Sequence, residues 1–164
     1  MSKPNETNEI LEWYHLYKNG VYGYIFTFVR NHADTEDILQ NVFLALLNLG
    51  EKTKKIKYPK SYIFRMARNE TMRILKKTNK ESVKDSFFFD KQSVNNIDDF
   101  IDKNEIQTAL DKLPLEEREI IIMRVYEQMT FKEIACITNR FLPSITTKYY
   151  RAIKKLKLFL GEKQ

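Results

Sequence analysis

The stretch Met129-Thr-Phe-Lys-Glu-Ile-Ala-Cys-Ile-Thr-Asn-Arg-Phe-Leu-Pro-Ser-Ile-Thr-Thr-Lys-Tyr-Tyr-Arg-Ala-Ile-Lys-Lys-Leu156 predicts two helices separated by a short turn. Thr130 can cap the first helix, because Glu133 three residues later completes a capping box. Ala135 is small where a second helix would cross closely, and Asn139 suits a turn that requires positive φ. This arrangement is typical of a helix-turn-helix.

The second predicted helix, from about Pro143 to Leu160, has one apolar and one polar face. The apolar face is expected to pack inward and carries Ile145, Tyr149, Ala152, Ile153, Leu156 and Leu160. The polar face is expected to point outward and carries Thr146, Thr147, Lys148, Tyr150, Arg151, Lys154 and Lys155. It offers hydroxyl groups to base edges and cations to phosphates, without a carboxylate. A solvated surface helix is the alternative, but the preceding helix and turn favour DNA binding.

Composition restricts the class of protein. A chain of 164 residues can form one domain or two small ones, and 43% hydrophobic residues are enough to bury a core. No apolar run approaches the roughly 18 residues of a membrane span, and the acidic N-terminus does not resemble a signal peptide. The single cysteine, Cys136, cannot form an internal disulfide. These features predict a cytoplasmic protein with no membrane insertion.

The net charge of +6 is unevenly distributed along the chain. Residues 50–80 carry 11 basic and 2 acidic groups, and residues 140–164 carry 7 and 1. Residues 1–49 and 81–139 are instead acidic, with net charges of −3 and −6. Two separate basic blocks, each at the end of a helical region, suggest two contacts with one polyanion.

Residues 8–30 predict a first helical region with apolar residues at helical spacing, although Gly20 and Gly23 could break or bend it. Trp13, His15 and His32 lie in or beside this region. No Cys, His or carboxylate cluster at metal-ligand spacing surrounds them, so we expect no metal, no cofactor and no catalytic role.

The next predicted helix extends to Leu47, with Asp34 as its N-cap. Its wide apolar face carries Ile38, Leu39, Val42, Phe43, Ala45 and Leu46. A polar stripe lies on another side and consists of Asp37, Asn41, Leu44 and Asn48, with Gln40 alongside. An exposed leucine within a polar stripe fits an ordinary solvent face and a partner-binding face equally well.

A basic loop is predicted from Gly50 to Ser61, with Pro59 placed for the first turn of the following helix. That helix, Tyr62–Lys77, is expected to bury Ile63, Phe64, Met66, Ala67 and Ile74 and to expose Arg65, Arg68, Asn69, Met72, Arg73, Lys76 and Lys77. Lysines and the aromatic residues Tyr58 and Tyr62 could bind single-stranded nucleic acid through phosphate contacts and base stacking. A charged surface that only confers solubility is the alternative.

Residues 79–102 are rich in Lys, Asn, Ser and Asp, without a sustained period, and predict a flexible linker. Phe87-Phe-Phe89 is unusual there, because three aromatic rings in a polar linker need a site that shelters them. A helix from Asp102 opens the second domain, and Pro114 begins the next helix. The predicted fold class is therefore all-α, with two small helical domains, residues 8–78 and 103–160, the second containing the helix-turn-helix.

Several stretches together resemble a known family. Asp34 to Leu46 is similar to a D-A-E-D-L-x-Q-E-x-F helix, and Arg65-Met-Ala-Arg-Asn69 to an R-I-A-R-N core. They are followed by Leu113-Pro-Leu-Glu-Glu-Arg-Glu-Ile120, Phe131-Lys-Glu-Ile-Ala135, and Arg151-Ala152 ahead of Lys154, Lys155 and Leu156. In this order and spacing they resemble the sigma factors of bacterial RNA polymerase, in the small extracytoplasmic-function group of the sigma-seventy family.

The resemblance implies a role for each basic block and for the polar stripe. It implies that Asp37, Gln40, Asn41 and Leu44 contact core RNA polymerase. It implies that the minus-ten promoter element is opened, and a flipped base captured, by Lys54, Lys55, Lys57, Tyr62, Arg65, Arg68, Asn69, Arg73, Lys76 and Lys77. It also implies that the minus-thirty-five element is bound in duplex form by Ser144, Thr146, Thr147, Lys148, Arg151 and Lys155.

Some residues depart from the family's pattern. Tyr62 stands where tryptophan is common, and Asn139 stands where the turn usually has glycine. Thr138, Arg140 and Phe141 occupy positions that are usually apolar, apolar and a cap such as serine or proline. Phe141 and Leu142 could restore the lost apolar contact through a shifted turn, which would move the register of the recognition helix by one residue.

The sequence thus predicts a promoter-recognition subunit that binds core RNA polymerase and promoter DNA, has no catalysis of its own and serves as an alternative sigma factor in a signal or stress response. The family also implies an anti-sigma factor as a partner. A stand-alone helix-turn-helix regulator is the main alternative, but it would need neither the polar stripe nor a second basic block. A nucleic-acid enzyme is disfavoured, because no paired carboxylates or nucleophile and base set accompany the basic blocks.

Overall fold

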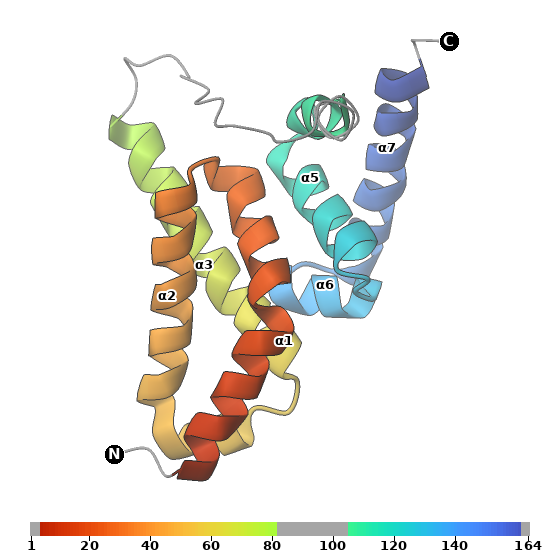
Figure 1. Cartoon of the computed structure of the whole chain (residues 1–164). Helices are drawn as coiled ribbons and strands as arrows, with labels where there is room; N and C mark the ends of the chain where they lie inside the picture. Colours follow the sequence, from red (N-terminus) through yellow and green to blue (C-terminus); the bar gives the residue numbers. More distant parts are fainter. Residues whose placement is uncertain (1–3, 82–104, 162–164) are drawn as a thin grey trace. The chain divides into compact units, whose positions relative to one another are not determined.

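The computed structural model describes residues 4–81 and 105–161, and every regular element in these two ranges is helical (Figure 1). The chain divides into two compact units, Met1–Asp90 and Lys91–Gln164. The predicted all-helical, two-domain fold class is confirmed. Residues 79–81 of the predicted linker still belong to a helix, whereas its remainder, with Phe87-Phe-Phe89, lies outside the described residues.

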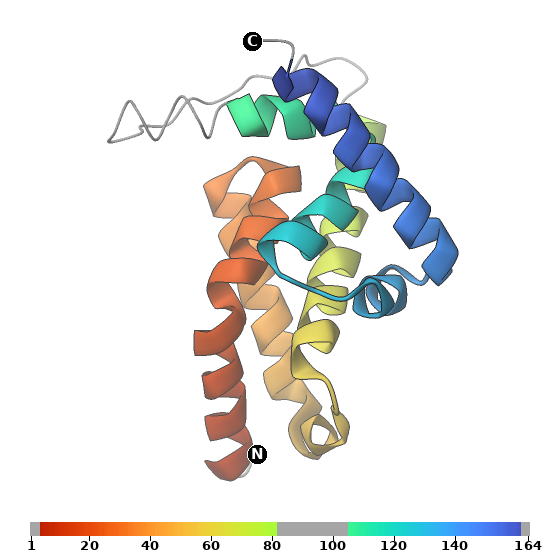
Figure 2. The same cartoon turned by 90° about the vertical axis from the view of Figure 1, so that its right-hand side faces the viewer.

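The first unit consists of three long helices that pack around an apolar core: α1 (Pro4–Val29), α2 (His32–Leu49) and α3 (Pro59–Glu81). Figures 1 and 2 show these helices side by side. Side chains with no exposed surface include Val21, Tyr24, Ile25, Ile38, Leu46, Ile63, Phe64 and Ala67. Met66 and Ile74 were predicted to be buried but are half-buried, because they lie toward the edge of the face that α3 buries.

α1 continues without interruption past Gly20 and Gly23, so neither glycine breaks the helix. Glycine in a helix costs about 1 kcal/mol relative to alanine. Val21, Tyr24 and Ile25 are fully buried in the core that α1 forms with α2 and α3. Burial of such side chains contributes about 1.5–3 kcal/mol each, which outweighs the cost of the two glycines.

α2 begins earlier than predicted. Asn31, not Asp34, is its N-cap: the Asn31 side chain accepts a hydrogen bond from the Asp34 backbone N–H at 2.9 Å. Asp34 therefore lies in the first helical turn, where its negative charge is favourable next to the helix N-terminus. Both residue types can cap a helix, so the pattern alone did not distinguish them.

The segment between α2 and α3 is more ordered than a loop. Gly50–Lys55 form a 3-10 helix, and α3 begins at Pro59. Gly50 has a φ of 56°, which side chains other than glycine rarely adopt. Thr53 is buried, and its hydroxyl donates to the Gly50 carbonyl at 2.7 Å. The lysines of this segment are therefore presented from a defined backbone.

The second unit starts with a helical stretch at residues 105–111 and continues with α5 (Leu115–Ile121), a π-helical turn (Ile122–Tyr126), α6 (Phe131–Thr138) and α7 (Leu142–Gly161). Its core contains Leu113, Ile120, Met123, Met129, Ile134, Ile137, Ile145 and Ala152. Leu160 is 43% exposed, so the prediction that it packs inward is wrong. Phe159, in the same turn, is the partly buried residue instead.

Arg118 connects the first helical stretch of this unit to α5. Its guanidinium donates to the carbonyl oxygens of Leu110 at 2.9 Å and of Asp111 and Leu113 at 3.1 Å. Carbonyls at the end of a helix lack partners within the helix, and a cation there is favourable. Arg118 therefore fixes the start of α5, the helix against which α7 packs.

Candidate nucleic-acid interface

The helix-turn-helix is formed by α6, a tight turn and α7. The Thr130 hydroxyl accepts from the Glu133 backbone N–H at 3.1 Å, as the predicted cap requires. Asn139 ends α6 in the left-handed conformation, with φ 55° and ψ 46°. The Arg140 N–H donates to the Ala135 carbonyl at 3.0 Å and closes the turn. The predicted cap at Thr130 and the predicted positive φ at Asn139 are both confirmed.

The two unusual residues of the turn, Thr138 and Arg140, have polar partners inside the unit. Thr138 is buried, and its hydroxyl donates to the Ile134 carbonyl at 2.8 Å. Arg140 lies 3.2 Å from Glu116 and 3.4 Å from Glu119, a carboxylate with no exposed side-chain surface. The expectation that Phe141 and Leu142 restore an apolar contact is therefore wrong: Phe141 is 85% exposed and Leu142 38%.

Two lysines of α7 that were predicted to point outward instead face α5. Lys148 forms a hydrogen-bonded ion pair with Glu116, and Lys155 pairs with Glu117 at 3.0 Å. The Glu117 side chain is only 5% exposed. The sequence pattern of one helix could not reveal these carboxylates, because they belong to α5, more than thirty residues earlier in the chain.

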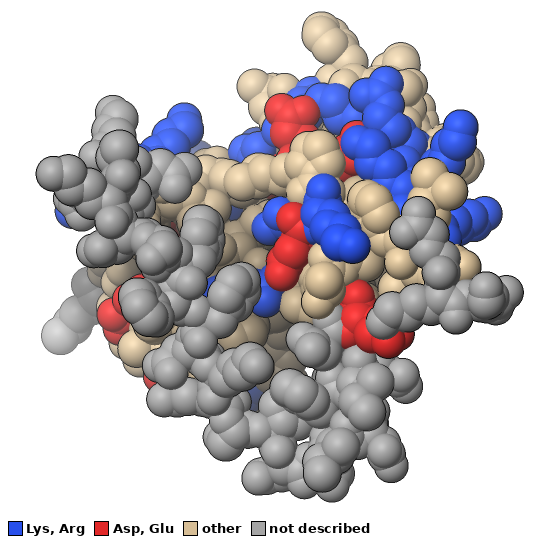
Figure 3. Space-filling model, turned by 90° about the horizontal axis from the view of Figure 1, so that it is seen from above, with Lys and Arg blue, Asp and Glu red and all other residues tan. Residues whose placement is uncertain are grey.

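The outward face of α7 retains Thr147, Arg151 and Lys154, which are exposed and recur at i, i+4 and i+7. Ser144 and Thr146 are half-buried, and the Thr146 hydroxyl donates to the Pro143 carbonyl at 3.0 Å. Figure 3 shows Lys and Arg side chains gathered where α7 lies, with Asp and Glu beside them. This face can offer a hydroxyl and two cations to a duplex.

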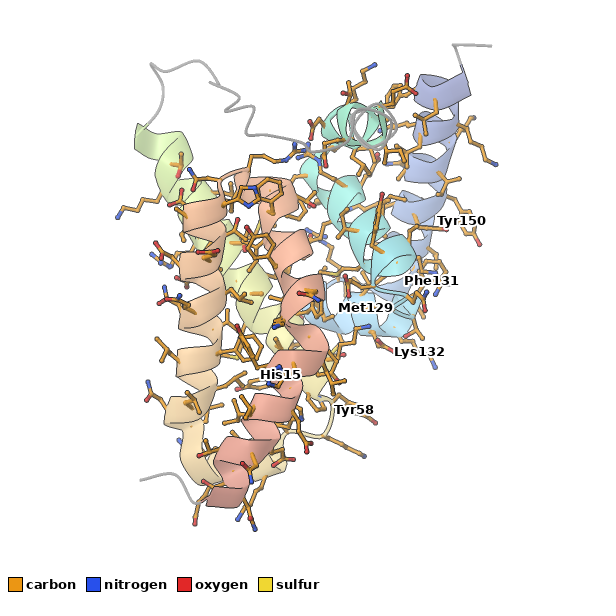
Figure 4. All side chains as sticks on the ribbon, in the orientation of Figure 1. His15, Tyr58, Met129, Phe131, Lys132 and Tyr150 are labelled. Carbon is orange, nitrogen blue, oxygen red and sulfur yellow. The ribbon has the colours of Figure 1, made fainter. Side chains whose placement is uncertain are left out.

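A row of half-buried and exposed aromatic rings connects α6 to α7, a feature that the sequence did not predict. Arg124 of the π-helical turn lies 4.4 Å from the Phe131 ring centre and donates to the Met129 carbonyl at 2.9 Å. Phe131 contacts Tyr149 edge to face, and Tyr149 contacts Tyr150 in the same way, at 5.2 and 5.3 Å between centres. Figure 4 shows Phe131 and Tyr150 on this side of the unit.

In the first unit, the predicted polar stripe lies on the surface of α2. Its four proposed contact residues, Asp37, Gln40, Asn41 and Leu44, are all exposed. Leu44 is 55% exposed, although its neighbours Val42, Phe43 and Leu46 on α2 are buried. The stripe is thus open to a partner, with an apolar side chain at its centre.

The basic segment before α3 exposes Lys52, Lys54, Lys55 and Lys57. The Lys54 ammonium also lies 3.5 Å from the buried Glu6 carboxylate of α1. Tyr58, labelled in Figure 4, is 67% exposed. The Lys57 ammonium lies 5.7 Å from its ring centre. An exposed ring next to lysines can stack on an unpaired base while the cations hold its phosphate. Tyr58, one of the two aromatic residues expected to stack on bases, is exposed on this surface.

Along α3, the predicted contacts Tyr62, Arg65, Asn69, Lys76 and Lys77 are exposed, and Arg68 is half-buried. Arg73 is exposed but hydrogen-bonded to Glu70, with contacts of 2.6 and 3.2 Å. This hydrogen bond lowers the pKa of the Glu70 carboxyl, which therefore keeps its negative charge. The basic face of α3 thus includes one carboxylate, adjacent to Asn69.

Within residues 4–81 and 105–161, no group of three or more His, Cys, Asp or Glu side chains could hold a metal ion. None of the helices in these ranges combines the length and apolar character that crossing a membrane requires.

Two family models match the chain. Residues 13–81 match the family model of sigma-70 region 2, and residues 103–156 match that of sigma-70 region 4. Among curated proteins of Bacillus subtilis strain 168, RNA polymerase sigma factor SigV is 29% identical over 144 residues, covering 88% of this chain and 86% of SigV. The ECF RNA polymerase sigma factor SigX is 25% identical over 162 residues, covering 93% and 82%.

Solved structures show the same fold. The sigma factor RpoE of Bartonella quintana, in complex with the anti-sigma factor NepR, superposes with a TM-score of 0.70 at 18% identity, covering 95% of this chain and 99% of RpoE. CnrH, in complex with the cytosolic domain of CnrY, also gives 0.70, at 15% identity and with coverage of 96% and 91%. The chain belongs to the sigma-70 family, in its extracytoplasmic-function group.

Proposed function

We propose that this protein binds core RNA polymerase and directs it to specific promoters as an alternative sigma factor. The observation that carries the proposal is the occurrence, in one chain, of an exposed polar stripe on α2 and of a cationic recognition helix, within matches to sigma-70 regions 2 and 4. A stand-alone regulator would need only the second of these. No observation favours that alternative.

The domain proposed at residues 8–78, which lies within the first unit, binds polymerase and the opened minus-ten element. Asp37, Gln40, Asn41 and Leu44 would contact the polymerase. Lys55, Lys57, Arg65 and Asn69 are exposed on one continuous part of the chain next to Tyr58 and Tyr62. Promoter opening would then follow from capture of unpaired bases by stacking and hydrogen bonding, without hydrolysis or another catalysed step.

The domain proposed at residues 103–160, which lies within the second unit, binds the minus-thirty-five element in duplex form. Thr147 and Arg151 would contact bases or phosphates from the outward face of α7, with Ser144 and Thr146 near its N-terminus. Lys148 and Lys155 are assigned a different role, because their ammonium groups bind carboxylates of α5. They position α7 on the unit instead of contacting DNA.

An anti-sigma factor is proposed as a regulatory partner, because RpoE was solved in complex with the anti-sigma factor NepR and CnrH in complex with the cytosolic domain of CnrY. The cytoplasm is proposed as the location, because the template and the polymerase are there.

Reconstituted transcription tests the proposal. Purified protein and sigma-free core polymerase are incubated with a library of promoter fragments, and transcript start sites are sequenced. We expect initiation at defined positions on fragments that share two sequence elements. Core polymerase alone is the control, and the absence of any protein-dependent start site would contradict the proposal.

Two cations of α7 are expected to respond differently to removal. Arg151→Ala should weaken binding of the minus-thirty-five duplex by about 1–3 kcal/mol and reduce the salt dependence of binding, because the contact of the exposed Arg151 guanidinium with DNA is lost. Lys148→Ala should leave the salt dependence unchanged, because this ammonium already binds Glu116. Fluorescence anisotropy at several salt concentrations measures both, and equal salt slopes for the two variants would contradict the assignment.

A similar split is expected in the first unit. Lys55→Ala with Lys57→Ala should lower the salt slope for binding of the holoenzyme to a single-stranded minus-ten fragment by about 0.7 per lost phosphate contact. Lys54→Ala should change it less, because Lys54 pairs with Glu6. A salt titration against a labelled oligonucleotide gives the slopes, and a larger change for Lys54→Ala would refute this division.

A further inference from the structure

Phe141, the residue immediately before α7, is 85% exposed, more than any other large hydrophobic side chain in the described residues. Its carbonyl accepts the hydrogen bond of the Ile145 N–H at 3.2 Å. Phe141 therefore occupies the position that caps the recognition helix.

Phenylalanine is a poor residue for this position. Ser, Thr, Asn or Asp there would accept a backbone hydrogen bond and contribute about 0.5–2 kcal/mol, which a benzyl side chain cannot do. The ring also contributes little to the core, because most of its surface stays in water. Phe141 thus neither caps the helix with its side chain nor packs into the core of its own unit. A residue that breaks both local rules in this way indicates a functional position.

The backbone that presents the ring is well defined. Asn139 fixes the turn in the left-handed conformation. Arg140, the residue directly before the phenylalanine, is held by Glu116 and Glu119. In helix-turn-helix proteins, the N-terminal residues of the recognition helix contact base edges in the major groove. The ring is thus placed at the end of α7 that enters the groove.

The chemistry of the ring limits what it can recognise there. Benzene carbons neither donate nor accept a hydrogen bond, so the ring cannot use the polar groups of guanine, cytosine or adenine. The only apolar group that bases present in the major groove is the C5 methyl of thymine. Cations along the same helix, Arg151 and Lys154, supply attraction for the surrounding phosphates.

We propose that the Phe141 ring packs on the C5 methyl group of a thymine at one end of the minus-thirty-five element and makes that position of the promoter specific. The inference rests on the proposed function, since it assumes that α7 binds this element.

The test uses holoenzyme and a promoter fragment selected in the transcription library. Each thymine of the minus-thirty-five element is replaced in turn by uracil, which removes one methyl group and changes no hydrogen bond. We expect one replacement to weaken binding to the wild-type holoenzyme by about three- to fivefold, the effect of exposing one methyl group. Phe141→Ser should bind the thymine and uracil fragments equally.

Two measurements make the outcome interpretable. Phe141→Ser supplies a capping hydroxyl, so its melting temperature should be equal to or above that of the wild type. Leu160→Ser removes another exposed apolar side chain at the opposite end of α7 and should retain the uracil response.

The inference would be overturned by an element without thymine, by no sensitivity to uracil, or by an unchanged uracil response in Phe141→Ser. If Phe141→Ser weakened binding to the thymine and uracil fragments by the same factor, the inference would also be overturned, because the ring would then pack on the sugar-phosphate backbone. If the holoenzyme still initiates at the selected promoter, only this inference fails. If no defined start site exists, the proposed function itself fails.

Discussion

Asn41→Arg combined with Leu44→Arg is expected to abolish binding of core RNA polymerase. Both residues are exposed on one side of α2, and Leu44 places an apolar side chain in the middle of a polar stripe. In a docked interface, two arginines would add bulk where the partner packs and bury charges without partners. Loss of a close apolar contact together with unpaired charge costs on the order of 3 kcal/mol or more.

Co-purification of the variant with tagged core polymerase measures the loss, and transcription from the selected promoter should disappear with it. The fold should be preserved, because neither side chain belongs to the core, and far-ultraviolet circular dichroism checks this. Leu16→Arg is the matched control, since Leu16 is a 69% exposed leucine on α1. Undiminished co-purification of the double variant would remove the polymerase role from this stripe.

Arg140→Leu is expected to have the largest effect on stability, confined to the second unit. Glu119 has no exposed side-chain surface, and the Arg140 guanidinium lies 3.4 Å from it. Removing one member of a buried ion pair costs about 3–5 kcal/mol, because the remaining buried charge loses the attraction of its ion partner. A helical unit of this size has a comparable total stability, so the variant unit should be largely unfolded.

Hydrogen exchange resolves the two units and should show lost protection in α5 to α7 with protection retained in α1 to α3. Adding Glu119→Leu to Arg140→Leu should restore most of the stability, since neither buried charge then remains. Arg73→Leu, which removes an exposed pair with Glu70 on α3, should change little. Full protection of α5 to α7 in the single variant would show that Arg140 does not hold the turn.

Local chemistry predicted much of this fold. Thr130 and Asn139 determine the ends of α6 through hydrogen bonds and a backbone conformation that concern only a few neighbouring residues. Pro59 determines the start of α3 in the same way. Helical spacing predicted the buried side of each helix, with errors at edges and ends, as for Met66, Ile74 and Leu160. The family motifs then identified which helix corresponds to which region.

The candidate site was less predictable, because charges on different helices meet only in the folded unit. Glu116 and Glu117 fit the first turn of α5 as partners of its dipole, yet their carboxylates bind Lys148 and Lys155 of α7. Glu6 likewise meets Lys54 across the first unit. Cations that looked equivalent in the sequence therefore divide into positioning residues and exposed candidates for DNA contact.

Helix periods, caps and the order of the motifs depend on neighbours within a few positions, so the sequence was sufficient to determine an all-helical chain of two units with a helix-turn-helix in the second. The tertiary structure decided which polar groups face solvent. In the folded unit, Arg140 pairs with the buried Glu119 carboxylate, whereas Phe141 is exposed. The physical reason is that a side chain's exposure depends on what packs against it from distant parts of the chain, and no local pattern contains that information.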